Sequence, residues 1–520
     1  MFAKIKSAGL QGMDGFPVDI EADVINGIPG FVISGALSTE TREAQARVWN
    51  AVKNIGTFME PKKIIVNLSP ASVRKEGTAF DLGIAVAVIC GYGVVNYKKL
   101  QDTAFLGELG LDGSLKSIRG TLSLAFSLKA CGIRRLVLPY ANAAEASLVE
   151  ELEVFGCSDI REVLGLLYEL TDGRELRSFR ESLPSPIKEV QEGAYTDFSE
   201  VRGQHMLKRA AEIAVSGRHN LLMSGPAGTG KTLIAKCMPG IMPELTREED
   251  IEISKVYSIC GLLPEGQPLI GARPFRSPHH GITEAAFAGG GMRVLPGELS
   301  LASGGILFLD ELPLFNRNVL EILRQPLEDH RITVSRLYGS FKYPADFILV
   351  GAMNNCACGF YPGPKCTCTR AQIKAYSGRL SKPLMERIDI CAEANPVKVD
   401  ELVGKRVQKE EGSAAIRQRV EAMYALQAER FKNEEVKFNS RMGIKEIERY
   451  CVLGKTETDF MKDIYSRKGL SGRTYHKILK VARTIADMDG CGDISVEHLA
   501  EAVEMRSIED RVFGRQVGDE

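Results

Sequence analysis

The chain has 520 residues, and its 66 basic side chains nearly balance its 67 acidic ones, so no global electrostatic field demands a nucleic acid or a membrane as partner. The length predicts about three domains. The sequence contains no apolar run of about 18 residues and no signal-peptide pattern, which predicts a cytoplasmic protein without a membrane-spanning helix. Twelve cysteines, most of them in apolar segments, fit a reducing compartment.

Residues 1–171 are expected to form an α+β domain. Strand-like runs at 63–68, 104–107 and 135–139 alternate with helical patterns at 39–52 and 122–130. The pair Asp112-Gly113 lies between two strand-like runs and predicts a hairpin turn.

A linker is expected at 172–198, because this segment is polar, loses its periodicity and contains Pro184-Ser-Pro186. A second domain, of the α/β class, is expected at 199–396 and begins with a helix at 206–216. The rest of the chain, 397–520, is helical in pattern.

The strongest signal is a glycine-rich segment between an apolar strand and a helix. Its spacing is G-x-x-x-x-G-K-[ST], and it consists of Gly225, Pro226, Ala227, Gly228, Thr229, Gly230, Lys231 and Thr232. The glycines let successive backbone N–H groups turn toward a phosphate, and the helix N-terminus adds its dipole. We expect Lys231 to reach the β- and γ-phosphates of ATP and the Thr232 hydroxyl to ligate Mg²⁺.

A second apolar strand, at 305–309, ends in Asp310 and Glu311. Its continuous apolar run is typical of a buried parallel strand. We expect Asp310 to hold the Mg²⁺ water shell and Glu311 to polarise the water that attacks the γ-phosphate. The two motifs together predict a protein that binds and hydrolyses a nucleoside triphosphate.

Several further motifs follow in a fixed order. They are the His279-His280 segment, Pro296-Gly-Glu298 and the strand at 347–354. With the two motifs above, they resemble the ComM/YifB family of Mg-chelatase-like AAA+ ATPases over nearly the entire chain. The resemblance implies an AAA+ P-loop core, a C-terminal helical lid and a ring, expected to be a homo-hexamer, with ATP between neighbouring subunits.

The resemblance also implies roles for three residues outside the two motifs. Asn354 would be the sensor that positions the attacking water, because it ends the strand expected beside that of Asp310. Arg387 would reach the γ-phosphate of the neighbouring subunit, a role that suits its permanently charged fork. Arg473 would be a second sensor, contributed by the lid.

The N-terminal domain resembles the Lon-protease-like domain, a ribosomal S5 domain 2-like fold, on the segments 107–120 and 131–139. A Lon-type peptidase needs a nucleophilic serine activated by a lysine. This chain has Ala79 where that serine would stand and Leu122 where the lysine would stand. The resemblance therefore implies the fold without peptidase chemistry.

Four cysteines form a separate cluster: Cys356, Cys358, Cys366 and Cys368. Four thiolates on a short loop rich in glycine and proline can close tetrahedrally on a structural Zn²⁺. The C-x-C spacing is tighter than the usual zinc spacing, so disulfides and free thiols remain as alternatives. A reducing compartment disfavours the disulfides, and oxidation disfavours exposed thiols.

The lid pattern predicts helices at 398–407, 414–431, 444–451, 457–468 and 475–486, with a last one ending at 505. Six basic residues and no acid lie between 466 and 486. Apart from Arg473, we expect these cations, among them Lys477, Lys480 and Arg483, to face solvent.

Three functions compete. The family resemblance favours a DNA motor that translocates on branched or single-stranded DNA and moves junctions during natural transformation, with recombination proteins as possible partners. The alternative is a chelatase-like or protein-remodelling ATPase that works with a partner protein. An ATP-dependent protease is disfavoured by Ala79 and Leu122. For DNA we expect pore loops at 288–293 and 331–343, with contacts from Arg293, Arg336 and Lys342.

Overall fold

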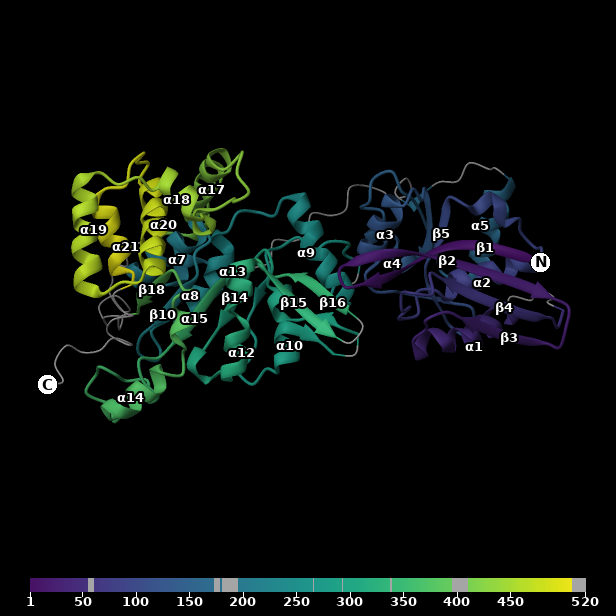
Figure 1. Ribbon diagram of the computed structural model, residues 1–520, viewed down its shortest axis with the longest axis horizontal. Helices are drawn as coiled ribbons and strands as arrows, with labels where there is room; N and C mark the ends of the chain where they lie inside the picture. Colours follow the sequence, from purple (N-terminus) through teal and green to yellow (C-terminus); the bar gives the residue numbers. More distant parts are fainter. Residues whose placement is uncertain are drawn as a thin grey trace.

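The computed structural model describes residues 1–54, 60–172, 178–179, 195–264, 266–291, 293–336, 339–394 and 410–506. The expected linker prolines at 184–186 and the expected helix at 398–407 lie outside the described residues. Figure 1 shows an elongated molecule with the N-terminal domain at one end, an α/β core in the middle and the lid helices at the other end.

The N-terminal domain is built on a seven-stranded mixed sheet with the order β3-β4-β2-β1-β5-β8-β9. Strand β1 pairs antiparallel with β2 and parallel with β5. The strands are β1 (Phe2–Gln11), β2 (Asp14–Ile25), β3 (Gly30–Ser34), β4 (Lys63–Ser69), β5 (Thr103–Phe105), β8 (Arg135–Pro139) and β9 (Glu153–Cys157). The expected strands at 63–68, 104–107 and 135–139 are thus confirmed as β4, β5 and β8.

In the described residues of this domain, five helices accompany the sheet. They are α1 (Thr39–Asn54), α2 (Asp81–Gly91), α3 (Thr121–Ala130), α4 (Tyr140–Ala146) and α5 (Ile160–Asp172). Helix α2 is buried along its full length because apolar or small residues occupy almost every position. The predicted turn at Asp112-Gly113 joins β6 (Glu108–Leu109) to β7 (Leu115–Lys116), and Gly113 adopts a φ of 88° that favours glycine there.

The central domain contains a five-stranded sheet with the order β11-β14-β17-β10-β18, and every neighbouring pair is parallel. Its strands are β10 (Leu221–Ser224), β11 (Phe275–Arg276), β14 (Ile306–Leu309), β17 (Ile348–Met353) and β18 (Ile390–Glu393). Strands β10, β14 and β17 are buried at every residue, as their continuous apolar runs predict. The predicted α/β class with a P-loop core is confirmed.

The helices of this domain are α7 (His205–Gly217), α8 (Lys231–Cys237), α9 (Arg247–Cys260), α10 (Glu284–Ala288), α11 (Glu298–Leu301), α12 (Arg317–Ile322), α13 (Pro326–Asp329), α14 (Arg370–Ser377) and α15 (Lys382–Met385). Two hairpins project from it, formed by β12 (Gly289–Gly290) with β13 (Leu295–Pro296) and by β15 (Arg331–Arg336) with β16 (Gly339–Pro344). The segment 288–293, expected to be a loop, is therefore partly a strand, since Gly289 and Gly290 form β12.

The lid consists of α17 (Ser413–Arg430), α18 (Ile444–Tyr450), α19 (Lys455–Lys468), α20 (Gly472–Met488) and α21 (Val496–Glu504). Buried side chains of α20 and α21 share one hydrophobic cluster with α7, α8 and one face of the central sheet. The lid is thus packed directly on the central domain.

The prediction of a solvent-facing basic surface on α20 is wrong for three residues. Lys477 forms an ion pair of 2.5 Å with Asp389, Arg483 is 3% exposed and pairs with Asp487, and Lys480 donates to the carbonyl of Ser440 at 3.1 Å. Lys477 and Lys480 reach groups of neighbouring elements, which sequence periodicity does not reveal, whereas Arg483 pairs with an acid one turn further along α20.

The N-terminal domain contacts the central domain through α3 and α9. The backbone N–H of Gly120 donates to the carbonyl of Ser258 at 3.1 Å, and the buried Glu145 carboxylate accepts hydrogen bonds from the Ser258 hydroxyl and the Leu122 N–H. Burial raises the pKa of Glu145 above its ordinary value. The tip of the β1–β2 hairpin reaches the β15–β16 hairpin, where Gly12 lies against Phe341.

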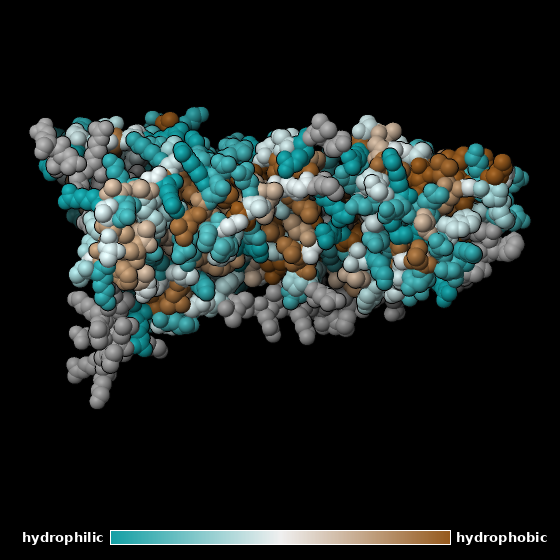
Figure 2. Space-filling model, turned by 90° about the horizontal axis from the view of Figure 1, so that it is seen from below, coloured by the Kyte–Doolittle hydropathy of each residue, from teal (hydrophilic) through white to brown (hydrophobic). Residues whose placement is uncertain are grey.

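Figure 2 shows polar and apolar areas interspersed along this face, with apolar surface at the end formed by the N-terminal sheet. Exposed apolar side chains of that domain include Ile25, Ile28 and Val32. Within the described parts of the chain, no helix combines the length and hydropathy needed to cross a membrane.

Candidate active site

The glycine-rich loop joins the end of β10 to the start of α8, as its sequence pattern predicts. Gly225, Gly228 and Gly230 have φ values of 151°, 77° and 88°, which side-chain-bearing residues rarely adopt. At Gly225 a Cβ would also lie 2.6 Å from the carbonyl oxygen of Ala394, at the end of β18. Glycine at this position therefore permits both the turn and the close approach of two strands.

Lys231 is the first residue of α8, and its side chain folds back over the loop. Its ammonium donates to the carbonyls of Gly225 and Pro226, both at 2.8 Å. The side chain is only 8% exposed, and burial lowers the pKa of Lys231 to about 8, an effect that the nearby Asp310 carboxylate opposes. The loop thus holds a cation at the helix N-terminus.

Asp310 and Glu311 follow β14 at the carboxyl edge of the sheet. Asp310 accepts a hydrogen bond of 2.8 Å from the Thr232 hydroxyl, so the two side chains expected to hold Mg²⁺ lie together. Glu311 has a left-handed φ of 51°, and its carboxylate is 53% exposed. Such a backbone conformation is unfavourable for a residue with a side chain and is often found at functional sites.

Asn354 follows β17, the strand that lies between β14 and β10 in the sheet. Its side-chain oxygen lies 3.4 Å from the Lys231 ammonium. Parallel strands end at the same edge, so Asn354, Asp310 and the loop converge there.

Sequence reasoning did not connect His280 to this site. The His280 ring nitrogen Nδ1 lies 3.9 Å from the Glu311 carboxylate, and its ring is tilted against that of His279 with centroids 4.0 Å apart. The only signal in the sequence was the adjacent histidine pair, and two adjacent histidines do not by themselves indicate a partner.

Arg387 and Arg473 lie next to each other, on different elements. Arg387 forms an ion pair of 2.7 Å with Glu328, and Arg473 lies 3.8 Å from the same carboxylate oxygen. Arg387 is largely covered, since its guanidinium also donates to the carbonyls of Arg324 and Pro383, whereas Arg473 is 64% exposed. No hydrogen bond or ion pair joins either arginine to Lys231, Asp310 or Glu311 among the described residues.

Asp389, two residues after Arg387, connects this arginine to the lid. Its buried carboxylate pairs with Lys477 of α20 at 2.5 Å and accepts from the backbone N–H of Asn220 at 2.9 Å. The Lys477 ammonium also donates to the Arg387 carbonyl at 2.7 Å. Although burial opposes ionisation, Lys477 and His219 hold the pKa of Asp389 well below its ordinary range. The lid and the Arg387 segment are thereby tied together.

The four clustered cysteines meet at one point. Their sulfur atoms all lie within 4.8 Å of one another, and Sγ of Cys356 lies 3.3 Å from Cys358 and 3.8 Å from Cys366. Backbone N–H groups of Phe360 and Thr367 lower the pKa of the Cys358 thiol to about 6. Zn²⁺ in structural sites is bound tetrahedrally by four such sulfur ligands, so the number, type and common position of these donors fit the ion.

The cysteine loop also touches the glycine-rich loop. The backbone N–H of Ala227 donates to the Gly359 carbonyl at 3.1 Å. Asn354 lies just before Cys356, and its side-chain oxygen lies 3.4 Å from the Lys231 ammonium. The cysteine loop therefore begins beside Lys231 and contacts the glycine-rich loop at Ala227. The sequence placed the cluster beside Asn354 but did not reveal the contact with Ala227.

The three expected DNA contacts do not lie together. Arg336 passes over Gly290, where a Cβ would be 2.5 Å from its guanidinium, so it lies close to the segment that carries Arg293. Lys342 follows Phe341 on β16 and belongs to the opposite side of that strand. Tyr338, which belongs to the expected pore loop at 331–343, is outside the described residues.

The two positions expected to carry peptidase residues have different surroundings. Leu122, a residue of α3, is completely buried in a hydrophobic cluster. Ala79 lines a cavity between the N-terminal and central domains. Neither side chain can supply a nucleophile or a base.

Three family models match the chain. "Subunit ChlI of Mg-chelatase" matches residues 20–142, "Magnesium chelatase, subunit ChlI" matches residues 197–402, and "Magnesium chelatase, subunit ChlI C-terminal" matches residues 410–506. Together these matches span most of the N-terminal domain, the central domain and the lid.

Curated relatives are similar over nearly the full length. The chain is 38% identical to the uncharacterized protein YifB of Salmonella typhimurium, covering 98% of this chain and 97% of the relative. It is 37% identical to the competence protein ComM of Haemophilus influenzae, covering 97% of each. The magnesium-chelatase subunit ChlI of Guillardia theta is 24% identical, over 61% of this chain and 84% of that protein.

Proposed function

Since this chain belongs to the ComM/YifB family of Mg-chelatase-like AAA+ ATPases, we propose that it is an ATP-driven ring motor that acts on branched or single-stranded DNA. The proposed work is branch migration during recombination of incoming DNA. The observation that carries the proposal is the similarity to a competence protein along nearly the entire chain, N-terminal domain included.

ATP is proposed to bind on the loop between β10 and α8. The Lys231 ammonium would leave the carbonyls of Gly225 and Pro226 for the phosphates, which are stronger acceptors because they are charged. Thr232 and Asp310 would hold Mg²⁺, and their existing 2.8 Å hydrogen bond supports this because both oxygens already face one point. When bound, Mg²⁺ neutralises charge on the phosphates.

Glu311 is proposed to take the proton of the attacking water, and Asn354 to orient that water. The exposed Glu311 carboxylate and the position of Asn354 beside Lys231 support these roles. His280, 3.9 Å from the Glu311 carboxylate, would fix its orientation.

The ring is proposed to be a homo-hexamer in which Arg387 stabilises the γ-phosphate held by the neighbouring subunit. Arg473 would act with it, because both guanidiniums already converge on one carboxylate, Glu328. A γ-phosphate would take the place of that carboxylate, since both are anions that bind a guanidinium fork.

Zn²⁺ is proposed to bind the cysteine loop as a structural ion. The common position of the four sulfur atoms supports it. Four thiolates leave no open coordination position, so the ion would brace the loop against Ala227 rather than take part in hydrolysis.

The test is the rate of ATP hydrolysis with and without DNA. Single-stranded or branched DNA should raise the rate severalfold, since a translocating motor couples hydrolysis to its track. If DNA has no effect while a partner protein stimulates hydrolysis, the chain is instead a chelatase-like or protein-remodelling ATPase, and the proposal fails.

A further inference from the structure

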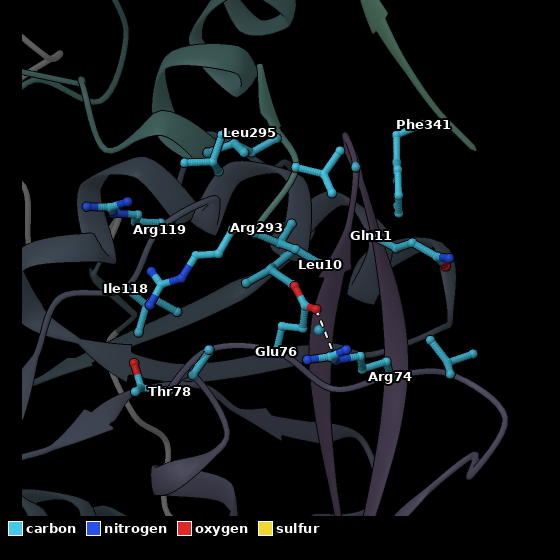
Figure 3. Close-up of a pocket in the computed structure, with 18 of the residues that line it drawn as sticks. Leu10, Gln11, Arg74, Glu76, Thr78, Ile118, Arg119, Arg293, Leu295 and Phe341 are labelled. Atoms are coloured by element: carbon cyan, nitrogen blue, oxygen red, sulfur yellow. Dashed lines mark ion pairs between the residues drawn. The ribbon is translucent and has the colours of Figure 1, made fainter. Parts of the chain in front are cut away.

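The N-terminal and central domains enclose a cavity of about 880 Å³ that the nucleotide site does not use. Figure 3 shows its walls, with Leu10, Arg74 and Arg119 contributed by the N-terminal domain and Arg293 and Phe341 by the central domain. A volume of this size is in the range of about 300–1,000 Å³ that is typical of ligand sites.

The cavity is basic, although the chain as a whole has a net charge of only −1. Four arginines line it, against two glutamates. Two of the arginines, Arg293 and Arg336, belong to the loops expected to contact DNA, and the other two, Arg74 and Arg119, line the cavity from the N-terminal domain. A nearly neutral protein that binds a phosphate backbone must gather its cations locally, as this cavity does.

Two of the cavity arginines, Arg293 and Arg74, form ion pairs that are exposed and replaceable. Arg293 pairs with Glu40 at 2.5 Å, but the two side chains are 51% and 38% exposed. Arg74 pairs with Glu76 at 3.2 Å, and these side chains are 42% and 37% exposed. Exposed ion pairs contribute little stability, so a phosphate can displace either carboxylate at small cost.

An aromatic ring and apolar walls accompany the arginines. Phe341 lines the cavity together with Leu10, Ile118 and Leu295. Proteins that bind single strands combine cations for the backbone with aromatic side chains on which bases stack. An isolated phosphate or a small acid would not need the aromatic face.

The two walls are held in a fixed relation. Gly120, adjacent to Arg119, donates its N–H to the Ser258 carbonyl at 3.1 Å, and the buried Glu145 carboxylate bonds to the Ser258 hydroxyl beside it. Since Ile259, the next residue, lines the cavity, these contacts hold Arg119 close to the central-domain wall of the cavity.

We propose that this cavity holds a segment of single-stranded DNA, with phosphates on the four arginines and a base on Phe341, and that the N-terminal domain is therefore a DNA-binding part of the motor. This inference rests on the proposed action on DNA. It goes further by assigning the strand to a site shared between two domains.

The experiment measures binding of a labelled oligo(dT) to full-length protein by fluorescence anisotropy across a salt series. Changing Arg74 and Arg119 together to alanine should lower affinity at least about tenfold at low salt and reduce the log–log salt slope by about 1.4 units, at about 0.7 per lost contact. Phe341→Leu should lower affinity about fivefold or more but leave the salt slope unchanged, because it removes stacking and no charge.

The matched control changes Arg134 and Arg161, two exposed arginines of the same domain outside the cavity, to alanine. It should bind like wild type, and the melting temperatures of all variants should agree. Wild-type affinity and slope in the Arg74/Arg119 variant, or an equal loss in the control, would overturn the cavity assignment while leaving the DNA motor intact. Displacement of the oligonucleotide by stoichiometric pyrophosphate would instead assign the cavity to a small anion. A wild-type protein that binds no DNA would overturn both proposals.

Discussion

Replacing Gly359 by alanine should weaken ATP binding although this residue is not in the P-loop. Gly359 has a φ of 81°, and a Cβ there would lie 3.2 Å from the Cβ of Ala227. The left-handed conformation costs a residue with a side chain about 1–2 kcal/mol, and the crowded contact adds to this. The loop can relieve both by moving away from Ala227, which breaks the hydrogen bond between the Ala227 N–H and the Gly359 carbonyl.

The cysteine loop contacts the P-loop through this hydrogen bond. We therefore expect most of the free-energy cost of the substitution to weaken the binding of ATP. A change of about 1–2 kcal/mol corresponds to a dissociation constant raised by a factor of about 5–30. The assay is a titration with a fluorescent ATP analogue in the presence of Mg²⁺.

Gly132→Ala is a matched control for this experiment. Gly132 also has a φ of 81°, but it lies in the N-terminal domain, and a Cβ there would have no neighbour within 4 Å. It should lower the thermal stability of its own domain by a similar free energy and leave ATP affinity unchanged. Wild-type affinity in Gly359→Ala, or the same loss in both variants, would refute the coupling between the two loops.

The remaining predictions concern the nucleotide site and the cysteine cluster. Glu311→Gln should bind ATP normally but hydrolyse it several orders of magnitude more slowly, whereas Lys231→Ala should weaken binding itself; normal turnover in the former would remove the assigned base. Mixing inactive Arg387→Ala with inactive Lys231→Ala subunits should restore some ATPase activity, and mixed rings that stay inactive would exclude a site shared between subunits. Elemental analysis should find about one zinc per chain, and changing Cys356 and Cys358 to serine should lower the melting temperature before it affects ATP affinity; metal-free protein of unchanged stability would contradict this. Burial lowers the pKa of Lys231 from 10.5 to about 8, so the ammonium loses its proton as the pH rises through that value. ATP affinity should therefore fall between about pH 7 and about pH 9, and ATP binding should be accompanied by uptake of a proton. An ATP affinity that calorimetry finds to be independent of pH would show that the lysine stays charged.

The parts of the site that sequence analysis located are those specified by local pattern. Glycine spacing, the strand before it and the helix after it are all encoded within a few residues of Lys231. The acids after β14 were found in the same way, since they directly follow a buried apolar strand, whereas the asparagine after β17 was assigned through the family resemblance. Parallel pairing of these strands then brings the side chains together without further information.

The features that sequence analysis did not locate depend on distant partners. Lys477 was expected in solvent because helical periodicity does not reveal Asp389, 88 residues away, which pairs with it across the lid interface. The convergence of Arg387 and Arg473 on Glu328 depends on three separate elements. The cavity between the domains likewise depends on the contact of α3 with α9, which neither helix encodes alone.

The segment 288–293, with three successive glycines, shows a third kind of difference. Three successive glycines were expected to form a loop, because glycine weakens regular structure. In the structure, Gly289 and Gly290 pair with β13, and their φ values of 103° and 145° are accessible to glycine alone. The absent side chain at Gly290 also leaves space for the Arg336 guanidinium. Glycine at this position lets the Arg336 guanidinium come close, but the run of glycines in the sequence does not indicate which group will approach.

Movement of a synthetic branched DNA junction is the measurement that tests the proposed motor most directly. A labelled four-way junction is incubated with the protein and ATP, and the separated product strands are resolved on a gel. The wild-type protein should convert the junction in an ATP-dependent manner, and Glu311→Gln, which retains the nucleotide but not the proposed base, should not. An active ATPase that binds the junction and leaves it unmoved would contradict the proposal.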